Sequence, residues 1–165
     1  YNVSEPVSPL RLNEERNLFK LFQNDVGLLS SQYSDGIALR IIRGEVNVNY
    51  GAVYENLTAQ ELSAHGFSLY YFNSKKLGEL DFVLETSDGV VPVEVKSGKD
   101  YERHNALKNV LACDNYGIRN AIVLTNDNLR TSGRVTYMPI YMLMFIRKNA
   151  ASSPQIVVPD LTGLV

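Results

Sequence analysis

The stretch DFVLETSDGVVPVEVKSG, from Asp81 to Gly98, has the pattern of a β-hairpin. Apolar residues alternate with others on both sides of Ser87-Asp88-Gly89, and short alternating runs around an Asp-Gly pair are a strong hairpin signal. The first run nevertheless opens on Asp81, and the second carries Glu94 and Lys96 between valines. The question is why a sheet would hold two acids and a lysine together.

Alternation assigns each hairpin residue to a face, because successive side chains of a strand point to opposite sides. A turn centred on Asp88-Gly89 places Asp81 opposite Lys96, and a turn one residue earlier places Asp81 opposite Glu94. Either register puts Asp81, Glu94 and Lys96 on one face, close enough to share one ion, whereas a three-residue loop with a bulge would break the pattern. The other face of the first strand is predicted to carry Leu80, Phe82 and Leu84.

The composition is that of one soluble globular domain. The chain has 165 residues, 45% of them hydrophobic and 21% charged, which is enough to bury a sizeable core. A net charge of −2 argues against a basic nucleic-acid coat but leaves room for a local positive groove. Cys113 alone permits no internal disulfide, which fits a reducing compartment and a buried thiol. The longest apolar run, 137–146, is too short to span a bilayer.

The pattern along the chain predicts an α/β fold with a mixed sheet flanked by helices. Residues 1–12 are expected to be a linker, 13–148 the domain and 149–165 a C-terminal tail. A strand–helix–strand step near the end predicts a parallel pair. Helices are expected over 35–43, 51–64, 103–116 and 140–147, with a further short helix capped by Asp25, and strands over 68–73, 121–125 and 135–138 besides the hairpin.

A fourth polar residue joins the hairpin acids in this interpretation. Glu55 shares a helical face with Ala59 and Leu62, which directs its carboxylate towards the body of the domain. Burying an ionised carboxylate is costly unless it is paired or bound to a cation, and Mg²⁺ is usually held by one or two carboxylates. The alternative is a solvent-exposed Asp, Glu and Lys on the wet face of an ordinary hairpin, with Glu55 solvated on its helix.

These residues resemble a known motif. Asp81, a twelve-residue gap and then Glu94-Val95-Lys96 resemble the motif of the PD-(D/E)XK nuclease superfamily, whose preceding helix contributes a glutamate, here Glu55. Four stretches are similar to one branch, the uncharacterised domain at the C-terminus of many prokaryotic AAA+-type ATPases. The resemblance covers residues 14 to 146 and rests on FKLFQNDVGLL, GAVYEN, YYFNSKKLGELDFVLE and VPVEVKSG. Leu80 departs from the proline that the superfamily often has before the aspartate.

The resemblance implies a restriction-endonuclease-like core, an ATPase upstream in the parent chain and a cytoplasmic prokaryotic setting. It implies that Asp81 and Glu94 hold Mg²⁺ or Mn²⁺, with Glu55 reaching the metal directly or through a water. Lys96 then positions or deprotonates the attacking water, or stabilises the developing charge; the sequence leaves these roles open. The substrate implied is nucleic acid, with DNA favoured.

Three functions stay open on the sequence: a metal-dependent phosphodiester hydrolase, a catalytically idle module of the same fold for DNA binding or ATPase assembly, and a plain protein-interaction domain. The intact motif favours the first. The chain lacks G-x-x-x-x-G-K-[ST], so this segment does not hydrolyse ATP. His65 and His104 are expected on the surface. Basic residues that are candidates for phosphate contacts are Lys75, Lys76, Lys99, Arg103 and Lys108.

Overall fold

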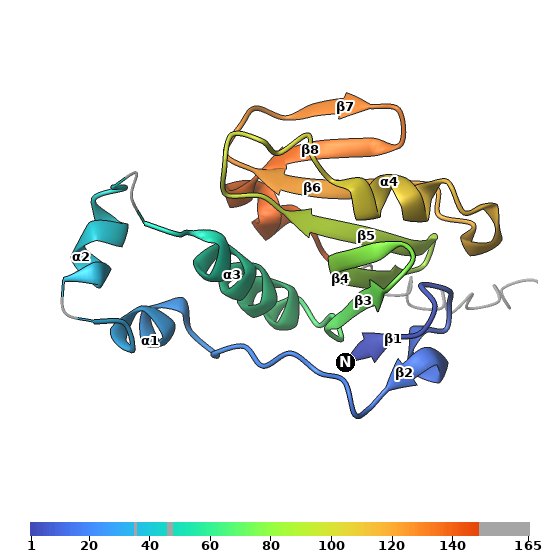
Figure 1. Ribbon diagram of the computed structural model, residues 1–165, viewed down its shortest axis with the longest axis horizontal. Helices are drawn as coiled ribbons and strands as arrows, with labels where there is room; N and C mark the ends of the chain where they lie inside the picture. Colours follow the sequence, from blue (N-terminus) through green and yellow to red (C-terminus); the bar gives the residue numbers. More distant parts are fainter. Residues whose placement is uncertain (35, 46–47, 149–165) are drawn as a thin grey trace, which may run out of the picture.

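An eight-stranded mixed sheet forms the centre of the protein, and helices lie on both of its faces (Figure 1). The computed structural model describes residues 1–34, 36–45 and 48–148. The strands are β1 (Asn2–Val3), β2 (Glu14–Glu15), β3 (Tyr70–Ser74), β4 (Gly78–Thr86), β5 (Gly89–Val95), β6 (Ala121–Thr125), β7 (Arg130–Ser132) and β8 (Val135–Pro139). The α-helices are α1 (Val26–Ser31), α2 (Ile37–Ile42), α3 (Gly51–Ala64) and α4 (Asn105–Leu111), and the 3₁₀ helices are η1 (Leu10–Asn13), η2 (Asp114–Tyr116) and η3 (Ile140–Phe145).

The strands lie in the order β2-β1-β3-β4-β5-β6-β8-β7. The β3–β4 and β4–β5 pairs are antiparallel, whereas β6 is parallel to both β5 and β8. The chain passes from β5 through α4 to β6, which is the strand–helix–strand step that the sequence predicts. The predicted α/β class with a mixed sheet between helices is therefore confirmed.

The hairpin adopts the second of the two predicted registers. Phe82 lies opposite Val93 and Leu84 opposite Val91, and the turn falls at Ser87-Asp88. The pairing ends at Phe82 and Val93, and Asp81 and Glu94 are the next residues along their two strands. The two acids of the motif therefore lie near each other on adjacent strands.

A β-bulge in β4 changes which faces its residues occupy. Tyr70 pairs with Val83 but Phe72 pairs with Leu80, so β4 has one more residue than β3 over this interval. Leu80 and Val83 consequently join the same core cluster, while Phe82 joins the cluster on the opposite face. The prediction that Leu80 and Phe82 share a face was wrong, because the extra residue interrupts the alternation at Asp81.

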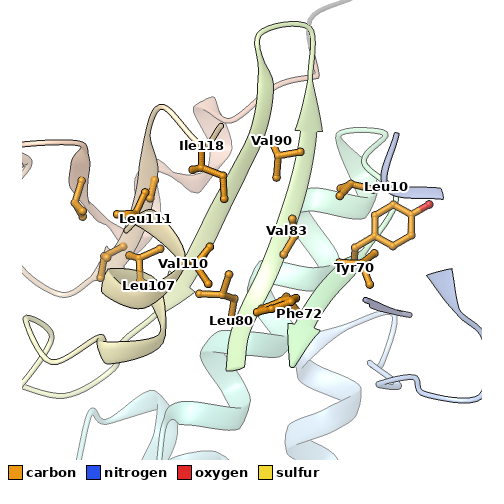
Figure 2. Close-up of a cluster of buried hydrophobic side chains, with 14 of the residues drawn as sticks. Leu10, Tyr70, Phe72, Leu80, Val83, Val90, Leu107, Val110, Leu111 and Ile118 are labelled. Atoms are coloured by element: carbon orange, nitrogen blue, oxygen red, sulfur yellow. The ribbon is translucent and has the colours of Figure 1, made fainter. Parts of the chain in front are cut away.

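Each face of the sheet carries its own hydrophobic core. On one face α4 packs its buried Leu107, Val110 and Leu111 against the strands, as the close-up shows (Figure 2). On the other face α3 and η3 pack against the strands. There Ala59 and Leu62 of α3 are buried.

Local signals account for the helix boundaries. α3 has the bounds predicted from the sequence, and Gly66 follows it with a φ of 82°, the left-handed conformation that terminates many helices. The Asp25 side chain caps α1 by accepting a hydrogen bond from the Leu28 amide at 3.0 Å. α4 is shorter than the predicted helix over 103–116, and η3 is a 3₁₀ helix rather than an α-helix.

The first residues belong to the sheet and not to a linker. β1 pairs in parallel with β3, and Val3 and Leu10 are fully buried. The prediction of a linker over 1–12 was therefore wrong, because the segment pairs with a strand that is distant in the sequence. The predicted tail, 149–165, lies outside the described residues. In the described part of the chain no helix is long and apolar enough to cross a membrane.

Candidate carboxylate site

The site forms where β4 begins and β5 ends. The β-bulge frees the Asp81 side chain from the ordinary alternation, and its Oδ2 accepts a hydrogen bond from the Val95 amide at 2.7 Å. A side-chain oxygen thus takes a position that a backbone carbonyl normally fills in a β-ladder. This bond fixes Asp81 beside Glu94 on the neighbouring strand.

Glu94 is an almost completely buried carboxylate with one oxygen satisfied. It is 5% exposed, and its Oε1 pairs with Lys96 Nζ at 2.7 Å. Within the described part of the chain its Oε2 has no hydrogen-bond partner. Burial, then the charge of Asp81, raises the pKa of Glu94 to about 7, and Lys96 opposes that rise. The carboxylate is therefore short of positive charge.

Burial and neighbouring charges also shift the pKa values of Asp81 and Lys96. Burial raises the pKa of Asp81, against the Val95 amide and the charges of Lys20 and Lys96. Burial opposes the charged form of Lys96, but its bond to Glu94 and the nearby acids raise its pKa above the ordinary value. Lys96 is thus held as a cation, with about a third of its side chain exposed to solvent.

Glu55 approaches from α3, on the side of Asp81. Its side chain is half-buried and lies 3.9 Å from Lys20 Nζ. Burial and then the Asp81 charge raise its pKa, while Lys20 lowers it. The structure thus brings Asp81, Glu94 and Lys96 into one cluster, with Glu55 bordering Asp81.

Lys20 is a residue of this site that the sequence did not predict. Its ammonium pairs with Glu79 and Glu55 and lies 5.1 Å from the centre of the Tyr71 ring. Burial disfavours its charge, but Glu79, Glu55 and Asp81 raise its pKa above the ordinary value. The only signal for it was its place in FKLFQNDVGLL, one of the four stretches that carry the family resemblance.

The segment that carries Lys20 is fixed to α3 by side-chain contacts. Asn56 bonds both backbone groups of Gln23, accepting from its amide at 2.8 Å and donating to its carbonyl at 3.1 Å. Phe22 packs against Phe82, with ring centres 5.6 Å apart. These contacts explain why Asn56, on the helix that carries Glu55, is buried.

The donor set suits a divalent cation in one respect. Two carboxylates stand side by side, and the buried Oε2 of Glu94 lacks a partner among the described residues. Nowhere in those residues do three His, Cys, Asp or Glu side chains converge on one point. Asp81 and Glu94 therefore fit Mg²⁺ or Mn²⁺ held by two protein carboxylates, with waters and substrate oxygens completing the shell.

The predicted basic residues do not gather on this cluster. Arg103 pairs weakly with Asp100 at 4.0 Å, and Lys108 lies exposed on α4. Lys75 and Lys76 are exposed in the turn between β3 and β4, and Lys99 follows β5 three residues after Lys96. Contact of these side chains with phosphate stays a prediction.

His104 is buried and the His65 side chain is only 6% exposed, so the expectation that they lie on the surface was wrong. His104 is 3% exposed, and its Nε2 lies 2.8 Å from the Tyr137 hydroxyl. The His65 ring donates from Nδ1 to the Ile146 carbonyl at 2.7 Å. Each ring links elements far apart in the sequence.

Comparisons with known proteins give one match. Residues 50–143 match the family described as "Domain of unknown function (DUF4143)". This domain is common at the C-terminus of AAA-type ATPases, which agrees with the branch resemblance found in the sequence, whereas nothing in the match points to the PD-(D/E)XK superfamily. No curated protein and no solved structure matches the chain.

Proposed function

The chain belongs to the DUF4143 family, and from its carboxylate site we propose that it is a metal-dependent phosphodiester hydrolase domain attached to a prokaryotic, cytoplasmic AAA-type ATPase. The observation that carries this proposal is the buried Oε2 of Glu94, which has no partner among the described residues and lies beside Asp81. A carboxylate in that state favours a cation, and a cation between two carboxylates suits phosphate chemistry.

Asp81 and Glu94 would hold Mg²⁺ or Mn²⁺ directly, and Glu55 would reach it through a water. A divalent ion at this place supplies an activated water and neutralises phosphate oxygens. Asp81 is oriented for this by the Val95 amide, which occupies Oδ2 and leaves Oδ1 for a ligand. Nucleic acid, with DNA favoured, is the proposed substrate.

Lys96 contributes positive charge at the same place. Its raised pKa keeps it protonated near neutral pH, which favours stabilisation of a phosphate over abstraction of a proton from water. Its partly exposed ammonium reaches solvent while it remains paired with Glu94. Of the roles that the sequence left open for Lys96, charge stabilisation is the one we propose.

A second function is favoured by Lys20. Its pairs with Glu79 and Glu55 neutralise acids that an active site would leave for a metal, and the described residues hold no three-carboxylate cluster. The second candidate is therefore a catalytically idle module that binds DNA or assembles the parent ATPase.

Two measurements separate the candidates. Plasmid and single-stranded substrates are incubated with Mg²⁺ or Mn²⁺ and wild type, Lys96→Ala or Glu94→Gln, with the exposed Lys148→Ala as the matched control. We expect cleavage by wild type and Lys148→Ala, with a loss of at least a hundredfold in the other two. Calorimetric titration should show weak metal binding that Asp81→Asn abolishes.

The outcomes against the proposal are equally definite. Cleavage that survives in Lys96→Ala and Glu94→Gln places the chemistry elsewhere or in a contaminant. An absence of cleavage by wild type, both alone and joined to its ATPase, together with an absence of metal binding, selects the idle module.

A further inference from the structure

A groove lies directly beside the carboxylate site. It has a volume of about 950 Å³, and its walls come from the α2 region, the start of α3, the segment after β5 and the end of β6. Ser97 and Gly98, which immediately follow Lys96, form part of its wall. The other lining residues used below are Tyr50, Tyr54, Lys99, Tyr101 and Asn126.

Three tyrosine rings line this groove with their hydroxyl groups already engaged. The Tyr54 hydroxyl donates to Asn126 Oδ1 at 2.9 Å, and the Tyr50 hydroxyl donates to the Glu45 carbonyl at 3.1 Å. The Tyr101 hydroxyl donates to Asp127. Because the polar ends are held, the rings are oriented before any ligand arrives, and what they offer to a ligand is aromatic surface.

Asn126 connects the groove to the segment after β5, next to Lys96. Its Nδ2 donates to the Ser97 carbonyl at 3.2 Å while its Oδ1 accepts from Tyr54. The amide thus joins the loop after β6, the segment after β5 and α3 in one network. A ligand on the tyrosine rings would therefore sit at a fixed position relative to the Glu94–Lys96 pair.

The charge of the groove permits a phosphate. Lys99 is exposed and forms no ion pair within the described residues. Asp127 in the wall accepts a hydrogen bond from the Tyr101 hydroxyl. This bond is the main cause that lowers the pKa of Asp127, and the charge of Arg130 acts in the same direction, so the negative charge of Asp127 is already offset by these two side chains. Among the described residues, the groove therefore combines oriented aromatic rings with one cation, Lys99, that forms no ion pair.

We propose that the groove binds unstacked bases of a single-stranded nucleic acid, next to the phosphate that the carboxylate site would process. The proposal rests on the proposed function, because that site identifies the ligand as a polynucleotide. Base faces are accessible to tyrosine rings only where a strand is unpaired, and the volume suits a drug-sized or larger ligand such as a nucleotide. Duplex nucleic acid does not offer such faces.

Fluorescence anisotropy on the full chain tests this without chemistry, using labelled single-stranded DNA, single-stranded RNA and duplex DNA in the presence of EDTA. Tyr54→Leu and Tyr50→Leu should weaken single-strand binding roughly fivefold to a hundredfold. Tyr141→Leu, at an exposed tyrosine on η3 outside the groove, should change it less than twofold. The DNA and RNA arms identify which strand is preferred.

Lys99→Gln gives a second readout that does not depend on packing. Its exposed side chain can be changed without loss of fold, and the slope of log affinity against log salt should fall by about one. Duplex binding as tight as single-strand binding, or unchanged affinity in Tyr54→Leu, Tyr50→Leu and Lys99→Gln, overturns the proposal.

The two proposals fail differently. Cleavage by wild type with groove variants that bind and cleave normally would refute the groove and leave the hydrolase. Ring-dependent single-strand binding without cleavage or metal binding would refute the hydrolase and leave the groove.

Discussion

Glu94 is the residue at which burial and charge conflict most clearly. The pKa of Glu94 is about 7 in the folded protein, raised from the ordinary 4.5. Between pH 4.5 and pH 7 the carboxyl group is therefore protonated in the folded state and ionised in the unfolded state. A raised carboxyl pKa adds stability that is complete below pH 4.5 and is lost as pH rises through about 7. The metal-free protein should therefore become less stable between pH 5 and pH 8 on account of this group.

Glu94→Gln should remove that pH dependence, because glutamine does not ionise. In EDTA the variant should be more stable than wild type at pH 8, by on the order of 2 kcal/mol, and the gap should close towards pH 5. Thermal unfolding across this pH range measures the difference. Glu102→Gln, at an exposed position, should follow wild type. A constant gap from pH 5 to pH 8 would contradict the burial argument.

Lys20 supplies positive charge next to Glu55 and Glu79, with which it forms ion pairs. Lys20→Gln leaves these acids and Asp81 with less positive charge, so metal-free stability should fall by about 1 kcal/mol at pH 7. Urea unfolding measures this change. Arg16→Gln, which removes an exposed cation paired with Glu14 at 3.4 Å, should change stability by less than about 0.5 kcal/mol. Equal effects of the two variants would mean that Lys20 acts only as a surface charge.

At the scale of elements, the join between β4 and α4 depends on a glycine. Gly78 has a φ of 99°, and a Cβ placed there would lie 2.8 Å from the Ala106 Cβ. Gly78→Ala should therefore cost roughly 2 to 4 kcal/mol, from both backbone strain and the clash. Chemical denaturation provides the measurement.

A double variant separates the two causes. Adding Ala106→Gly to Gly78→Ala removes the clashing atom but keeps the positive φ, so it should recover only part of the loss. Gly98→Ala is the control, because nothing lies within 4 Å of its Cβ position and its φ is not in the left-handed region. Full recovery in the double variant would show that the backbone conformation costs nothing.

Elements with strong local signals could be predicted from the sequence. Helix α3 and strand β6 have the predicted bounds, because a glycine terminates the helix and five consecutive apolar or β-branched residues form the strand. The hairpin pattern also brought Asp81 and Glu94 together correctly, since local alternation and a turn determine their proximity. These features need no knowledge of distant segments.

Features that depend on distant pairing could not be predicted. The bulge beside Asp81 arises from the pairing of β4 with β3, and the place of β1 arises from its pairing with the same strand. Lys20 reaches the site because Gln23 and Asn56 bond across 33 residues of sequence. Local periodicity in the sequence does not reveal contacts between distant segments, so only part of the candidate site could be predicted.

At the scale of the whole molecule, the two core layers are closed by segments from opposite ends of the chain. β1 pairs with β3 and, with β2, extends the sheet at that end (Figure 1), and η3 packs against α3. Leu10 packs into the α4-side cluster with Tyr70 and Val83, as Figure 2 shows. The first fifteen residues therefore belong to the folded body, although the family match begins at residue 50.

Leu10 and Leu12 offer a matched test of that conclusion, because both lie in the same 3₁₀ helix. Leu10 is fully buried, whereas Leu12 is 80% exposed. Leu10→Ala should lower the free energy of unfolding by roughly 2 to 5 kcal/mol through lost burial and a cavity, and Leu12→Ala should change it by less than about 0.5 kcal/mol. Urea unfolding followed by circular dichroism measures both. If residues 1–12 were a linker, the two substitutions would have the same negligible effect; a loss confined to Leu10→Ala places the N-terminal segment in the core.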